Sequence, residues 1–131
     1  METIQVKTGT RIQFVDITAR VRDAITKNRV EGGIAVVYVP HTTAGVTINE
    51  AADPAVVEDI NIALSGLVPH HRNYRHAEGN ADAHIKASLM GSSVNVIISK
   101  GELVLGTWQG IFFCEFDGPR SRTVMVKILP G

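Results

Sequence analysis

Five histidines are the side chains of this sequence best suited to acid–base or metal chemistry: His41, His70, His71, His76 and His84. His41 directly follows an apolar run and a proline, so we expect it where a core strand reaches the surface. His84 falls on a predicted helix and His76 in the loop before it. Imidazole nitrogens bind zinc and similar ions, often with a carboxylate completing the shell. The spacing matches no zinc motif, so solvated loop histidines remain the alternative, above all for His70 and His71.

Glu115 is the carboxylate with the most unusual neighbours, because the segment from Phe112 to Phe116 is otherwise apolar. Strand alternation places Ile111, Phe113 and Glu115 on one face, where the carboxylate would be partly desolvated. Burial raises the pKa of a carboxyl group toward the range useful for general acid–base catalysis. The alternative is an exposed strand end, where Glu115 meets solvent.

Three further polar residues each have a functional and a structural interpretation. Arg120 lies in a turn that begins at Asp117, and it could hold a phosphate or simply brace the turn. Asp53 precedes Pro54, a pattern that predicts a helix cap. Asn49 ends a predicted strand, a frequent place for functional polar groups.

Helices are expected in three places. The helical spacing of apolar residues predicts one helix from a cap at Asp16 to about Arg29, ended by a Gly-Gly pair. The Asp-Pro pair predicts a second helix that ends before Pro69. Asn80 is the expected cap of a third, Ala81 to Met90, which a glycine terminates. The segment between the second and third helices is expected to be irregular.

Strands are expected in the remaining segments, and most are joined as hairpins. The first two, Thr3–Val6 and Arg11–Val15, read as an opening hairpin. The apolar run Ile34–Val39 predicts a central strand buried on both faces. The others are Thr43–Asn49, Ser93–Ser99, Leu103–Phe116 with a break near Gly106, and Arg122–Leu129. Together these elements predict one α+β domain over residues 1–131, with helices packed on a largely antiparallel sheet or sandwich.

Composition limits the classes of partner. The chain has 131 residues, with 13 Lys and Arg balancing 13 Asp and Glu, so neither nucleic acid nor an anionic membrane is expected. No apolar stretch approaches the length of a membrane span, and the first residues do not read as a signal peptide. The lone Cys114 suits a reducing compartment, which predicts a cytoplasmic protein. Burying enough core in so small a chain favours an oligomer.

Three ordered blocks of this sequence resemble the YjbQ-like family. The first comprises His41-Thr42-Thr43-Ala44, Ile48-Asn49-Glu50 and Asp53. The second is Asn80-Ala81-Asp82-Ala83-His84. The third comprises Leu105 to Gln109 and Glu115 to Arg120. The similarity runs over nearly the whole chain and implies an α+β fold, a homotrimer and a polar site occupied by a metal or an anion. Carried over by motif, the site residues are Asn49, Asp53, Glu115 and Arg120, with His41, His76 and His84 as metal ligands.

The resemblance also implies an activity, because many members of this family carry the label secondary thiamine-phosphate synthase. In that hypothesis the three histidines bind a divalent ion, zinc or magnesium-like, Glu115 or Asp53 handles protons, and Arg120 holds the phosphate of a small phosphorylated metabolite. Pyrophosphate departure needs such cations. The sequence has no dedicated diphosphate loop, which favours a weak or side activity. The alternatives are a metal-dependent phosphoester hydrolase and a non-catalytic protein that binds a metal or small molecule.

Overall fold

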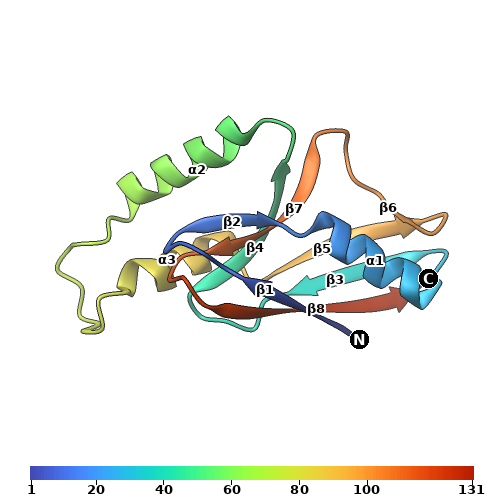
Figure 1. Ribbon diagram of the computed structural model, residues 1–131, viewed down its shortest axis with the longest axis horizontal. Helices are drawn as coiled ribbons and strands as arrows, with labels where there is room; N and C mark the ends of the chain where they lie inside the picture. The colour runs from blue at the N-terminus through green and yellow to red at the C-terminus, as the bar shows by residue number, and fades with distance from the viewer.

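Two antiparallel sheets stacked against each other form the body of the protein (Figure 1). The computed structural model describes residues 1–131. One sheet has five strands in the order β1-β8-β3-β5-β6, and the other has three in the order β2-β7-β4. The strands are β1 Glu2–Lys7, β2 Gln13–Asp16, β3 Gly33–Tyr38, β4 Ala44–Glu50, β5 Ser93–Ser99, β6 Glu102–Leu103, β7 Gln109–Glu115 and β8 Ser121–Pro130. The helices are α1 Thr18–Asn28, α2 Pro54–Leu67 and α3 Ala81–Met90. The predicted α+β class is confirmed.

Strand β7 separates two hydrophobic cores. Its residues Ile111 and Phe113 point into the larger core between the sheets, which also receives one face of α1. Its residues Phe112 and Cys114 point the other way, into a smaller core under α3. Because both faces of β7 are covered, a charged side chain on it has no direct route to solvent.

Strand β3 lies in the middle of the five-stranded sheet, as the apolar run predicts, but only one of its faces is buried. Ala35 and Val37 are fully closed to solvent, whereas Ile34 and Tyr38 remain 41% and 44% exposed. The prediction of burial on both faces is therefore wrong within a single chain. Nothing in this chain packs on the outer face of the sheet.

The predicted opening hairpin is also wrong. β1 pairs with β8 in one sheet, and β2 pairs with β7 in the other, so the two strands never meet as partners. The intervening residues cross from one sheet to the other instead of turning back. Alternating polarity identified both strands correctly but could not show which partner each one takes.

The predicted helices are present, with two differences in capping. Asp16 is the last residue of β2 and not the cap of α1; the residue at the cap position is Ile17, which makes no side-chain capping hydrogen bond. Asp53 caps α2 by accepting a hydrogen bond from the Ala55 N–H at 2.9 Å. Asn80 precedes α3, but its side chain makes no capping hydrogen bond. It donates instead to Asp117, so its role in the site replaces the expected role in the helix. No helix is long and apolar enough to cross a membrane.

Helix α3 lies very close to strand β4. A Cβ atom at Gly45 would come within 2.7 Å of the carbonyl oxygen of Gly91, the residue that follows α3. Glycine therefore allows the helix to sit directly on the strand. This contact holds the C-terminal end of α3 against the start of β4.

Candidate functional site

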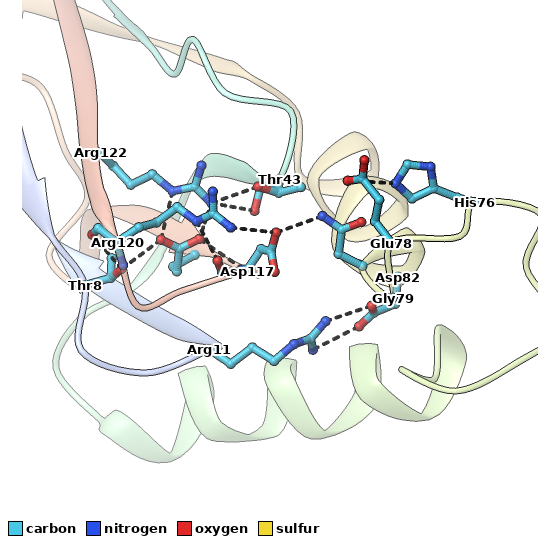
Figure 2. A network of polar contacts seen from close by, with 12 residues as sticks. Thr8, Arg11, Thr43, His76, Glu78, Gly79, Asp82, Asp117, Arg120 and Arg122 are labelled. Atoms are coloured by element: carbon cyan, nitrogen blue, oxygen red, sulfur yellow. Dashed lines mark hydrogen bonds and ion pairs between the residues drawn. The ribbon is translucent and has the colours of Figure 1, made fainter.

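A buried ion pair underlies the site. Glu115 at the end of β7 is 0% exposed, and Arg122 on β8 is 4% exposed. The Arg122 Nε donates to Glu115 Oε1 at 2.9 Å, and its Nη2 donates to Glu115 Oε2 and to the Thr43 hydroxyl. Thr8 donates to the same carboxylate at 2.8 Å. Figure 2 shows this network running from Thr8 through the two charged groups to Thr43.

The groups around Glu115 determine whether its carboxyl group is ionised. Burial alone would raise the pKa of this carboxyl group, but the hydrogen bonds from Arg122, the Asp117 N–H and Thr8 outweigh burial and bring the pKa below its ordinary value. Glu115 is therefore a structural anion at neutral pH. The expected raised pKa, suited to a general acid, is wrong, and so is the alternative of a solvated strand end.

The turn after β7 carries the exposed cation of the site. The Arg120 Nε donates a hydrogen bond to the backbone oxygen of Asp117 at 2.8 Å, and its Nη2 donates to the Asp117 carboxylate at 3.1 Å. Asn80 donates to the same carboxylate oxygen at 2.9 Å, which ties α3 to the turn. A Cβ at Gly118 would lie 2.3 Å from the Thr10 oxygen, so only glycine fits here. Arg120 both braces the turn and leaves N–H groups free.

A hydrogen bond from the backbone fixes which ring nitrogen of His41 carries the proton. Its Nε2 accepts a hydrogen bond from the Thr123 N–H at 2.9 Å, so the neutral ring carries its proton on Nδ1. Partial burial, followed by the charge of Arg122, lowers the pKa of His41. At neutral pH this ring is uncharged and offers one N–H donor.

The three expected metal ligands do not form a ligand set. The rings of His76 and His84 meet edge to face with centroids 5.2 Å apart, and His76 Nε2 lies 3.6 Å from Glu78. His41 has one ring nitrogen already occupied by Thr123. No group of three or more His, Cys, Asp or Glu side chains is arranged to hold a metal ion. The residues of one chain therefore do not fit a metal centre, and the divalent ion itself stays a prediction.

A polar pocket of about 420 Å³ brings His41, His84 and Arg120 together. Its walls come from the loop before β4, the first turn of α3 and the turn before β8. Apart from Pro40, every residue that lines it is polar or charged; the others include Asn80 and Arg122. The motif blocks at His41, at His84 and at Arg120 thus converge in space.

Asn49 and Asp53 lie outside this pocket. In the β4–β7 register Ala44 is opposite Glu115, whereas Asn49 is opposite Gly110, at the far end of the same strand. The Asn49 side chain accepts from the Glu50 N–H, and Asp53 caps α2. Within one chain these two residues are not brought to the other expected site residues.

A second buried charge cluster was not anticipated from the sequence. Asp82, 0% exposed, accepts two hydrogen bonds from Arg11 at 2.9 and 3.2 Å and one from Lys86 at 3.2 Å. Burial alone would raise the pKa of Asp82, but these two cations lower it below its ordinary value. Lys86 is itself 1% exposed and is engaged in this cluster. The i, i+4 spacing of Asp82 and Lys86 was the available signal.

Comparison with known proteins places the chain in a family. Residues 2–131 match the family described as UPF0047 protein YjbQ-like. This chain belongs to that family. A UPF0047 protein of Methanocaldococcus jannaschii is 58% identical over 95% of this chain and 91% of its own length. The UPF0047 protein YugU of Bacillus subtilis is 48% identical over 98% of both chains.

Solved structures of relatives have the same fold. A YjbQ/UPF0047 family protein from Clostridium acetobutylicum is 55% identical, has a TM-score of 0.97 and is matched over 98% of this chain and 100% of its own. A structure from Sulfolobus solfataricus is 34% identical, has a TM-score of 0.95 and is matched over 99% of this chain and 96% of its own.

These relatives correct the functional expectation. They are described only as UPF0047 proteins, as an uncharacterized conserved protein or as a protein of unknown function, and none carries a thiamine-phosphate synthase name. The single chain also lacks the histidine–carboxylate metal cluster that the hypothesis required. The assignment of this chain as a metal-assisted thiamine-phosphate enzyme is therefore wrong.

Proposed function

We propose that the polar pocket binds the phosphate group of a small phosphorylated molecule. The observation that carries this proposal is a pair of guanidinium groups with unused N–H donors on one pocket. All hydrogen bonds that the side chain of Arg120 donates use Nε and Nη2, and those that the side chain of Arg122 donates use the same two atoms. Each arginine therefore has an Nη1 group without a hydrogen-bond partner in the chain, and both residues line the pocket. Guanidinium N–H groups match phosphate oxygens in geometry and charge.

The rest of the pocket supports an anion. The Nδ1–H of His41 adds a neutral donor, and the first turn of α3 adds the partial positive charge of a helix N-terminus. Asp117 is already engaged by Arg120 and Asn80. Glu78 lies beside His76, and its side chain is 75% exposed. Asp117 and Glu78 are the two carboxylates that line the pocket, and they are therefore either paired or largely exposed to water.

Calorimetric titration with inorganic phosphate at constant ionic strength tests the proposal. Arg120→Ala removes the more accessible guanidinium, since this side chain is 52% exposed, without touching the buried pair. We expect the affinity to fall by about tenfold or more, the scale of a lost charged hydrogen bond. Arg22→Ala, an exposed arginine on α1, is the matched control and should bind as the unaltered protein does. Equal binding by both variants would refute the proposal.

We propose further that the chain assembles as a homotrimer through the outer face of the five-stranded sheet. Ile34 is in register with Ile97 on one side and Leu129 on the other. These three side chains are 41%, 62% and 48% exposed and form an apolar row across the sheet. Contact with a second copy would remove this row from water.

Sedimentation at micromolar concentration tests the assembly. The unaltered protein should sediment as a trimer, and Ile34→Lys should shift it toward the monomer because it places a charge in the apolar row. Lys27→Glu, on the exposed side of α1, should leave the trimer intact. A monomeric unaltered protein would contradict the proposal.

A further inference from the structure

A second hollow, of about 480 Å³, adjoins the polar pocket. The two share His41, Thr42 and His84, so these residues line both spaces. The remaining walls of the second hollow come from the end of α3 and the segment that follows it, together with the start of β4. A ligand held in the first pocket could therefore extend into the second hollow while staying in contact with the protein.

The lining of the second hollow differs from that of the first. It contains no Asp, Glu, Lys or Arg side chain, and small residues form most of its walls: Ala44, Ala87, Ser88, Gly91 and Ser92. Together with Thr42, the two serines place three exposed hydroxyl-bearing side chains around it. The Ser88 hydroxyl donates to the His84 oxygen at 3.0 Å, which leaves its oxygen free to accept a hydrogen bond.

We infer that the second hollow receives the uncharged, hydroxyl-bearing body of the ligand whose phosphate occupies the first pocket. The ligand class is thus a phosphate monoester of a polyol or sugar. Hydroxyl groups on such a ligand can both donate to and accept from the serine and threonine side chains, whereas a flat apolar body would leave them unpaired. This inference rests on the proposed phosphate site and specifies what is attached to the phosphate.

Three probes separate the two proposals: inorganic phosphate, glucose 6-phosphate and phenyl phosphate. By calorimetry, glucose 6-phosphate should bind about tenfold more tightly than inorganic phosphate and more tightly than phenyl phosphate. If no probe binds, the phosphate site fails and this inference falls with it. If all three probes bind with equal affinity, the phosphate site stands, and the inference that the second hollow receives the body of the ligand is refuted. Tighter binding of phenyl phosphate would refute the hydroxyl-bearing class.

Ser88→Leu fills the second hollow from an exposed position on α3. This variant should weaken the affinity for glucose 6-phosphate by about tenfold. The affinity for inorganic phosphate should not change, because the first pocket does not include Ser88. Ser65→Leu, an exposed serine on α2, is the matched control. An equal loss for both probes would overturn the inference.

A second readout does not depend on a variant. In two-dimensional NMR of the unaltered protein, the amide signals of Gly91 and Ser92 should shift with glucose 6-phosphate and stay in place with inorganic phosphate. Unmoved signals with both probes, although both bind, would also overturn the inference.

Discussion

Arg122 and Glu115 face each other as a nearly solvent-free ion pair, 4% and 0% exposed, between the two sheets and below the polar pocket. Removing one member leaves the other charge buried without its partner. Arg122→Met should therefore lower the free energy of unfolding by about 3–5 kcal/mol, measured by urea denaturation.

The matched control is the double variant Arg122→Met with Glu115→Met, which removes both charges. It should regain most of the lost stability, since a buried pair can be replaced by apolar groups at little cost. A double variant as unstable as the single one would show that the hydrogen bonds to Thr8 and Thr43 matter more than the charges.

The stability of the protein should fall in acid because of Glu115 and Asp82. Both carboxyl groups have a pKa below the ordinary values of 4.5 and 3.8. Their contribution is complete above those values and is lost as the pH falls through the lower pKa of the folded state. Urea denaturation at about pH 6 and about pH 3 should show a smaller acid loss in Glu115→Gln than in the unaltered protein. An identical loss in both proteins would argue against a lowered pKa at Glu115.

His41 should titrate below 6.5, its ordinary pKa, because burial and the charge of Arg122 disfavour the imidazolium. The stability that this shift contributes is complete above pH 6.5 and is lost as the pH falls through the lower folded pKa. NMR of the imidazole nitrogens should also show the proton on Nδ1, since Nε2 accepts from Thr123. A neutral ring protonated on Nε2 would contradict the proposed donor into the pocket.

Asp53→Ala should remove the cap of α2 and cost about 1 kcal/mol in the free energy of unfolding. The affinity for inorganic phosphate should not change, because Asp53 lies outside the pocket. Asn49→Ala, at the far end of β4, should likewise leave phosphate binding unchanged. A loss of binding in either variant would place these side chains in the site of the assembled protein.

The helices were the part of the fold that local signals predicted best. Asp53-Pro54 and the glycine after Met90 act within a few residues, so α2 and α3 begin and end where the sequence indicates. Strand pairing depends on partners far along the chain, and for that reason the crossing between β1 and β2 was taken for a hairpin.

Residue type and motif together pointed to His41, His84 and Arg120, and the structure brings these three residues to one pocket; their roles stay predictions. Desolvation was one of the two interpretations of Glu115, and the structure supports it. Its partner could not be found from spacing, because Arg122 lies on another strand in the other sheet. The sign of its pKa shift followed from that partner. Arg11 and Asp82 are 71 residues apart, and no local pattern links them.

The position of β8 has a consequence for folding. This strand is made last among the elements, yet it lies between β1 and β3 and pairs with both. During synthesis, β1 and β3 must wait with unpaired edges until β8 leaves the ribosome, so the five-stranded sheet forms only as a late, cooperative event. Until then those edges are open to pairing with other molecules.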